Sequence, residues 1–330
     1  MNLRVAARAY AVSNNARAWT ELGATFGAFV GLFLAALFSF EIYWFSVPLV
    51  MLLSLAHLRL YIIQHDCAHH AFFESRRLNE WVGMILSGFS MTPFHATQYI
   101  HNLHHAHVSD LEHRDTFEIF VMTTEEWEAA GFWRRLGYRL YRSPVTLILV
   151  GPFIFFTLIR RFPKEALITG LGKLALHNAL VVAVFGVAYL IGGWNGIWVW
   201  LGCIYFASVL GAFVSYVVHN FEEIHWGVKP ELDFQTAALE GSSVLDWGPF
   251  FDLVLMNIGY HDLHHLNSKI PGYRLKEAHR ALEADGLLTP VKIGLWDSIL
   301  CLRWKLYDKR AGVMVGFPNR QLKHWAIPAE

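Results

Sequence analysis

Apolar residues form long uninterrupted runs in this chain, and charged residues collect between those runs. Four runs, at about 21–40, 43–64, 174–192 and 195–218, are each long enough to cross a bilayer as a helix, because about twenty helical residues span a hydrocarbon core of about 30 Å. We therefore predict an all-α integral membrane protein with four transmembrane helices. Two shorter apolar stretches, 81–95 and 144–159, contain proline, and we predict interfacial or re-entrant helices there.

The distribution of basic residues pairs the predicted spans into two hairpins. Lysine and arginine are absent from 18–58 and from 174–228, and the turns inside these ranges hold only Glu41 or the glycine-rich segment 192–196. The positive-inside rule then places both termini and the middle of the chain in the cytoplasm. We predict one domain over residues 1–330, with a cytoplasmic helical cap at about 65–173 and 219–326. The tail at 295–308 alternates apolar and charged residues, which is typical of an amphipathic helix.

The composition is typical of a membrane protein and argues against nucleic acid as a partner. Hydrophobic residues make up 55% of the chain, charged residues only 16%, and the mean hydropathy is +0.33. The net charge is zero, so no basic face for nucleic acid is indicated. Three scattered cysteines define no disulfide framework, which fits a reducing, cytoplasm-facing environment.

Histidines gather where the apolar runs end. Three boxes have the spacing that places histidines on one helix face, and a further histidine follows the last span. These candidate metal ligands are His65, His69, His101, His104, His105, His219, His261, His264 and His265. So many neutral nitrogen ligands exceed the needs of one zinc ion and suit a two-metal site, and imidazole suits iron among other transition metals.

Carboxylates near the boxes are candidates to orient the ligating rings. Asp66 and Asp262 lie within boxes, and Glu222 and Glu223 follow the lone histidine. Asp110 and Asp115 follow the second box, where surface ion pairs are the simpler interpretation.

Other histidine chemistries fit the pattern less well. The zinc-protease motif His-Glu-x-x-His is absent, a haem needs only two axial histidines within the spans, and a metal transporter places polar ligands at mid-membrane. An all-nitrogen dinuclear site beside the bilayer favours oxygen activation and attack on an unactivated C–H bond of a lipid chain, reached through an apolar tunnel. Hydroxylation, acetylenation or ketolation, and non-enzymatic metal handling, stay open as alternatives.

At these boxes and their flanks the chain resembles the membrane-bound fatty acid desaturases, most closely the bacterial acyl-lipid and omega-6-like branch. The flanks are Gln64 to Cys67, His219 to Glu222, Gly241 to Ser243, Asn257 to Tyr260 and Ile270 to Leu275. The resemblance implies that the nine histidines hold two iron ions. It implies an enzyme that inserts a cis double bond into a membrane-lipid acyl chain, with O2 as co-substrate reduced to water. It also implies a separate electron carrier with its reductase, ferredoxin being the first choice, and a multi-pass location in a bacterial inner membrane.

The chain departs from the family pattern at several residues. Ser215 stands where the acyl-CoA branch has an Asn that approaches a metal, and Asn257 is a weak substitute. Four further histidines are atypical and are candidates to touch the site: His70, His95, His107 and His225. We assign a packing role to His57, expect Arg59 to extend toward the interface, and expect ordinary roles for His113, His177, His279 and His324.

Overall fold

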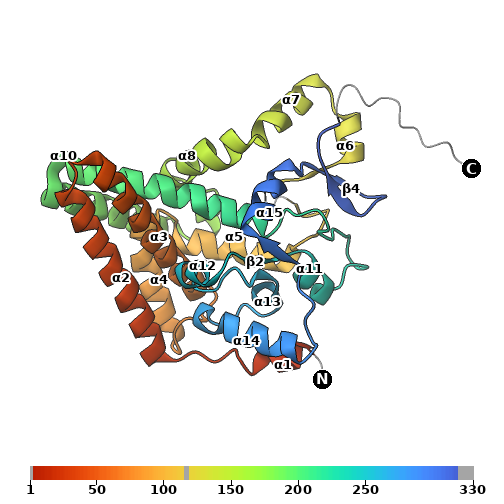
Figure 1. The fold of residues 1–330 in the computed structure, drawn as a ribbon, viewed down its shortest axis with the longest axis horizontal. Helices are drawn as coiled ribbons and strands as arrows, with labels where there is room; N and C mark the ends of the chain where they lie inside the picture. Colours follow the sequence, from red (N-terminus) through yellow and green to blue (C-terminus); the bar gives the residue numbers. More distant parts are fainter. Residues whose placement is uncertain (1–2, 115–118, 319–330) are drawn as a thin grey trace, which may run out of the picture.

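The computed structural model describes residues 3–114 and 119–318, and helices dominate both ranges. Four helical segments are long and apolar enough to cross a membrane: Asn15–Phe38, Trp44–Ala68, Val145–Thr169 and Leu171–Val217. Figure 1 shows the long helices toward one end of the molecule and most of the short elements toward the other. A mostly helical chain with four candidate spans is confirmed, although the boundaries differ from those predicted.

The first two predicted spans correspond to α2 (Asn15–Phe38) and α3 (Tyr43–Ala68), which pack along each other. Helix α2 begins earlier than its apolar run, because the side chain of Asn14 accepts a hydrogen bond from the backbone N–H of Arg17 at 2.8 Å and caps the helix. Arg59 is largely buried against a neighbouring helix, and its extension toward the interface stays a prediction. It forms an ion pair with Glu21 at 2.5 Å and donates to Thr25 at 3.0 Å, which ties α3 to α2.

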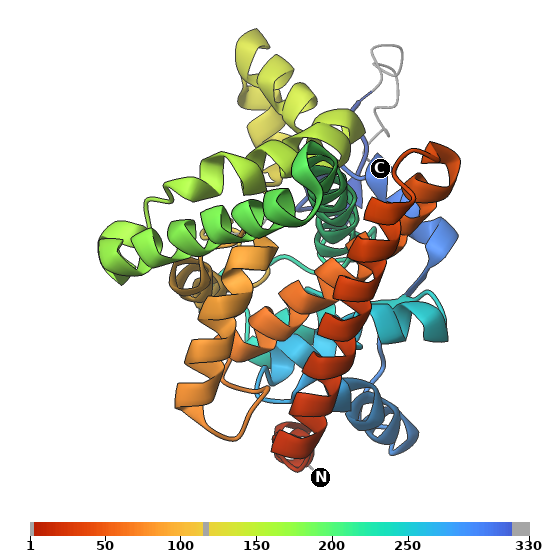
Figure 2. The ribbon, with the colours of Figure 1, turned by 90° about the vertical axis from the view of Figure 1, so that its left-hand side faces the viewer.

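The third and fourth predicted spans are the two halves of one long helix, α10 (Leu171–Val217). Its backbone leaves the helical region at Gly193, where φ is 56° and ψ is −141°, a conformation that glycine adopts readily. Gly196 passes so close to Ala188 that a β-carbon would lie 2.1 Å from the Ala188 carbonyl oxygen. The two halves therefore run in different directions, as Figure 2 shows.

The sequence predicts no membrane span over 145–169, but the length and composition of this helical segment make it a candidate span. It consists of a π-helix η1 (Val145–Val150), α8 (Gly151–Thr157), a 3-10 turn η2 (Ile159–Arg161) and α9 (Ala166–Thr169). Its two arginines are held inside the protein: Arg160 donates to Thr97 at 2.9 Å, and Arg161 bonds to His177 at 2.8 Å. The interfacial or re-entrant placement of this segment stays a prediction, as do the hairpins and the cytoplasmic cap.

The second short apolar stretch, 81–95, falls on α4 (Arg76–Ser90) and on the start of α5 (Phe94–His107). Helix α4 packs against α3 and α10, and a β-carbon at Gly88 would lie 2.8 Å from the Leu180 side chain. Met91 ends α4 in the left-handed region, with φ at 61°. This sharp turn directs α5 back beneath the end of α3.

Short elements complete the described chain. The remaining helices are α1 (Leu3–Arg8), α6 (Thr124–Ala129), α7 (Phe132–Tyr141), α11 (Phe234–Glu240), α12 (Pro249–Val254), α13 (His261–Leu266), α14 (Gly272–Ala284), α15 (Leu295–Leu300) and the 3-10 turn η3 (Cys301–Arg303). The strands are β1 (Met122–Thr123), β2 (Val244–Asp246), β3 (Lys292–Gly294), β4 (Leu306–Asp308) and β5 (Val313–Val315).

These strands correct the all-α prediction in detail. Strand β4 pairs in parallel with β1 and antiparallel with β5, and β2 pairs in parallel with β3. The tail predicted as one amphipathic helix over 295–308 is helical only in α15 and η3 before it becomes β4. The pairs β1–β4 and β2–β3 join segments that are distant in sequence, whereas β4 and β5 are neighbours in sequence. The helical hydrophobic pattern reveals none of these short strands.

Candidate metal centre

The nine predicted ligands come together from four places in the fold. The first pair lies in the last turn of α3 and at its C-cap, three histidines lie on α5, one follows the end of α10, and three lie on α13. They form two groups, and within each group the ligand atoms all lie within 4.8 Å of one another. The first group is His65, His69, His101, His105 and His264, and the second is His104, His219, His261 and His265.

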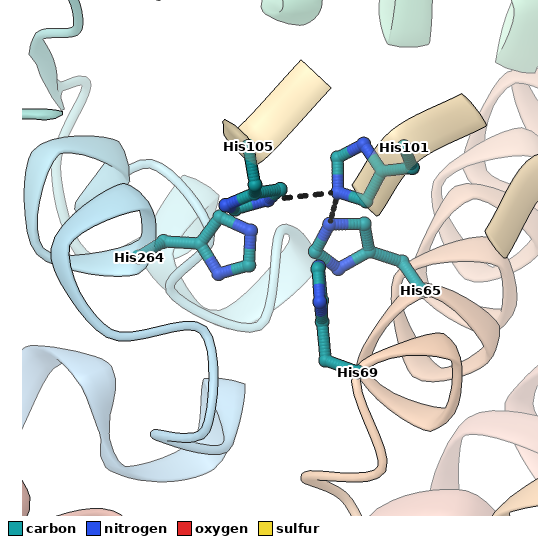
Figure 3. Close-up of side chains that lie close together, drawn as sticks. All are labelled: His65, His69, His101, His105 and His264. Carbon is teal, nitrogen blue, oxygen red and sulfur yellow. Dashed lines mark hydrogen bonds between the residues drawn. The ribbon is translucent and has the colours of Figure 1, made fainter. Parts of the chain in front are cut away.

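Figure 3 shows the rings of the first group turned toward one another. The Nε2 atoms of His65 and His101 are 2.8 Å apart, and those of His105 and His101 are 3.1 Å apart. Two nitrogens bound to one ion at about 2.1 Å, at right angles or tetrahedrally, lie about 3.0–3.4 Å apart. The spacing therefore suits ligands of a common ion.

The second group has similar spacings. Nε2 of His261 lies 3.0 Å from Nε2 of His219 and 3.2 Å from Nε2 of His265. The groups adjoin, since the His105 and His265 rings stack with centroids 4.2 Å apart. Two neighbouring positions for metal ions are thus available.

Burial sets the protonation state of these rings. Desolvation, followed by the nearby imidazoles, lowers the pKa well below its ordinary value for His69, His101, His105, His261, His264 and His265. Desolvation also lowers the pKa of His104 to about 3. The rings are therefore neutral near pH 7, which is the form that binds a metal.

Several buried ring nitrogens have no hydrogen-bond partner among the described residues. They are Nε2 of His69, both ring nitrogens of His264, and Nδ1 of His265. A buried ring nitrogen without a hydrogen-bond partner is unfavourable in a folded protein. A bound ion would satisfy the inward-facing ones, so the residues fit a metal.

Contacts behind the rings hold some of them in place. The Nδ1 atom of His219 lies 3.0 Å from the Gly241 carbonyl oxygen, and Nδ1 of His261 lies 3.3 Å from the Ile258 carbonyl oxygen. Each carbonyl can accept from Nδ1–H and leave Nε2 for a metal.

Asp66 links the first box to the start of α14, and its contact with His65 fits the orienting role predicted for it. Its Oδ1 lies 3.4 Å from Nδ1 of His65, and its Oδ2 accepts from the backbone N–H of Gly272 at 2.6 Å. A β-carbon at Gly272 would lie 2.7 Å from the Met256 carbonyl oxygen. This close approach explains why glycine occupies this position.

Asp262 contacts His279, a histidine for which the sequence predicts an ordinary role. Its Oδ1 accepts from the backbone N–H of Leu263 at 2.7 Å, and its Oδ2 lies 3.2 Å from Nε2 of His279. Both side chains are almost fully buried. His279 lies on α14, 14 residues after the third box ends at His265, and no local spacing indicates the contact.

The other carboxylate candidates lie elsewhere. Glu222 and Glu223 are exposed, so the predicted orienting roles are wrong for them. Asp110 contacts His107 and His113 instead of the nine. Asp115, like His324, lies outside the described residues.

The atypical histidines divide into separate groups. His70 and His95 bond to opposite oxygens of Glu80, at 2.6 and 3.0 Å, and so link the end of α3 to α4 and α5. None of these four atypical histidines, His70, His95, His107 and His225, belongs to the two groups formed by the nine predicted ligands.

The remaining candidates have structural roles. The His57 ring packs on Trp200, and its Nε2 lies 2.8 Å from the Phe89 carbonyl oxygen. His177 is buried between Ser87 and Arg161.

The side-chain N–H of Asn257 donates to the Gly272 carbonyl oxygen at 2.8 Å, and a ligand role for its amide oxygen stays a prediction. Ser215 lines the cavity beside the histidines and carries a hydroxyl, not an amide.

Two adjoining cavities lead to the histidines. The inner cavity, of about 110 Å³, is lined by apolar side chains and by five of the nine: His65, His101, His104, His219 and His261. The outer cavity, of about 460 Å³, is lined mainly by apolar residues of α3, α8 and α10. The two share Leu58, Tyr61, Ile119, Gly211 and Ser215, so an apolar path reaches the metal centre.

Fold and site together define a helical membrane protein with paired histidine clusters able to hold metal ions beside an apolar cavity. A family model for fatty acid desaturases matches residues 42–292. A fatty acid desaturase of Bacillus subtilis is 32% identical over 319 residues, which are 96% of this chain and 90% of that protein. The chain therefore belongs to the fatty acid desaturase family, and it is an oxidoreductase.

Two cyanobacterial relatives are named after lipid substrates. An sn-1 oleoyl-lipid 12-desaturase of Synechocystis is 24% identical over 81% of this chain and 76% of that protein. An sn-1 acyl-lipid omega-3 desaturase (ferredoxin) of the same organism is 26% identical over 73% of this chain and 68% of that protein. The family resemblance noted in the sequence is confirmed.

Proposed function

We propose that this chain is an O2-dependent acyl-lipid desaturase that introduces a cis double bond into a membrane-lipid acyl chain. The observation that carries the proposal is the pair of histidine clusters opening onto an apolar cavity. In balanced form, –CH2–CH2– plus O2, two electrons and two protons gives –CH=CH– plus two water molecules. The C–H bonds lose two hydrogens, and both oxygen atoms leave as water.

The nine histidines would hold two iron ions, five ligands around one and four around the other. Support comes from the N···N spacings within the clusters, from the lowered pKa of His264 and from its unpaired ring nitrogens. When bound, such a pair supplies the oxygen-activating redox chemistry that removal of hydrogen from an unactivated chain requires. The carbonyl and carboxylate contacts behind the rings keep them aimed inward.

The apolar cavities would bind the acyl chain. A chain that comes from the bilayer has already left water, so apolar walls would accept it without polar contacts and packing against those walls would hold it. Burial of the clusters also excludes bulk water from the reacting carbons, which limits side reactions. Lipid chains can enter from the bilayer beside α8 and α10.

Electrons would come from a separate carrier and its reductase. One relative carries ferredoxin in its name, and ferredoxin is our proposed donor. The positive-inside rule supports a bacterial inner-membrane location with the metal centre and both termini in the cytoplasm, where a soluble donor is available.

Expression in a host of known lipid composition tests the proposal. Cells producing the chain with a ferredoxin system should gain unsaturated acyl chains lighter by two hydrogens, whereas His264→Ala should give none. The matched control His225→Ala, outside both clusters, should retain activity. Products heavier by one oxygen would assign hydroxylation instead, and folded, iron-loaded protein that leaves the lipids unchanged would refute desaturation.

A further inference from the structure

A third cluster of metal-binding side chains lies just beyond the nine histidines. His107 is the last residue of α5, and Asp110 and His113 follow in the next turn. Nδ1 of His113 lies 2.9 Å from Oδ2 of Asp110, and Nδ1 of His107 lies 3.4 Å from the same oxygen. The ligand atoms of all three residues lie within 4.8 Å of one another.

The geometry differs from that of the other histidine–carboxylate cluster. In the His70–Glu80–His95 group the two rings bond to opposite carboxylate oxygens, so the carboxylate separates them. His107 and His113 instead approach a single oxygen, and their rings stack with centroids 4.1 Å apart and planes at 29°. Two nitrogens and one oxygen therefore converge on one point.

The electrostatic surroundings favour a cation at that point. The Asp110 side chain is only 1% exposed, and its other oxygen accepts from the backbone N–H of Glu112 at 3.0 Å. Within residues 3–114 and 119–318, no lysine or arginine forms an ion pair with this carboxylate. It also lies at the C-terminus of α5, where the helix carbonyls carry partial negative charge and cations are favoured. One of these carbonyls, that of Ala106, accepts from Lys229 Nζ at 2.7 Å.

The cluster is also accessible. The side chain of His113 is 47% exposed and that of His107 is 24% exposed. An ion could enter from solvent and keep water in its remaining position, as zinc does where the protein supplies three ligands.

We propose that His107, Asp110 and His113 bind one divalent transition-metal ion of the Zn²⁺ type, distinct from the two clusters of the metal centre. The ion would fix the C-terminal end of α5, the helix that carries three of the nine histidines. This inference goes beyond the proposed function and does not depend on it.

The test uses full-length, iron-loaded protein in detergent, titrated with Zn²⁺ and analysed for both metals by mass spectrometry. Wild type and the control His225→Ala should each bind one more zinc per chain than His113→Ala. The affinity at this site should fall at least about 10- to 100-fold in His113→Ala, with iron content unchanged. Asp110→Asn should behave in the same way, and Co²⁺ in place of Zn²⁺ should give a visible absorption spectrum that His113→Ala lacks.

Equal zinc uptake by wild type and His113→Ala, or uptake only in exchange for iron, would overturn the assignment. The difference between those two proteins isolates this site even when the nine histidines hold no iron. Failure here is therefore separable from failure of the proposed desaturase activity, which is read from lipid products.

Discussion

Gly211 sits where the inner and outer cavities meet, and its substitution tests whether the acyl chain uses this path. Gly211 lines both cavities, and a β-carbon there would lie 3.3 Å from Cδ1 of Leu58. A leucine at this position would extend into the passage that the cavities share. The change Gly211→Leu should therefore block the path while leaving the ligands in place.

The magnitude follows from the side-chain volume that the block adds to the passage. An acyl chain from the bilayer has already left water, so the effect is steric, about 1–3 kcal/mol as in an overpacked core, or about 5- to 150-fold in kcat/KM. Gly211→Ala should have a smaller effect, because Leu58 can move by the few tenths of an ångström required. Leucine is also a better helix former than glycine, so α10 should persist.

Double-bond formation in supplied acyl chains of different length measures the effect, with iron content as the check on folding. The matched control is Gly186→Leu on the same helix, where a β-carbon meets nothing within 4 Å. The control should retain activity. A folded, iron-loaded Gly211→Leu protein that desaturates long chains at the wild-type rate would refute the assignment of the path.

Three further predictions concern the metal centre. His264→Ala should lower metal affinity at the five-histidine cluster about 10- to 100-fold or more, seen as iron lost on dialysis; full iron content would contradict the ligand assignment. Glu80→Ala removes the hydrogen bonds to His70 and His95 and should reduce the unfolding free energy by about 1–3 kcal/mol. Glu80→Gln should have a smaller effect. An unchanged melting temperature in Glu80→Ala would show that this link does not stabilise the protein. Asp262→Asn and His279→Ala should weaken iron retention to a similar extent, because each removes one partner of the same contact. If the effects of the two changes add in the double variant, that result would argue against the contact.

The site was predictable from sequence to a large degree because its ligands follow helix periodicity. Histidines spaced by three and four residues share a face, and each box ends or begins beside an apolar run. The contact between Asp262 and His279 was not predictable, since α14 approaches α13 only after the intervening loop folds. Likewise, Arg59 forms an ion pair with Glu21 on another helix, 38 residues away in the sequence. Periodicity within one helix gives no information about that pairing.

The fold was less predictable where helices break. The pattern marked 192–196 as a turn, and the backbone at Gly193 does leave the helical region. For 145–169, the prolines predict an interfacial or re-entrant helix, and the structure pairs both arginines of this segment with polar groups of other helices. A charge that is satisfied inside the protein does not by itself mark a membrane boundary, so the placement of this segment stays a prediction.

The division of the nine histidines between two clusters follows from helix geometry once the helices are placed. Residues four apart differ by about 40° around a helix axis, whereas neighbours differ by about 100°. The pairs spaced by four, His101 with His105 and His261 with His265, therefore each stay within one cluster, while His104 and His264 turn to the other. Helices α5 and α13 thus each supply both clusters. A rotation of either helix would disturb both ion positions at once, so contacts that fix these two helices support the whole centre rather than one ion.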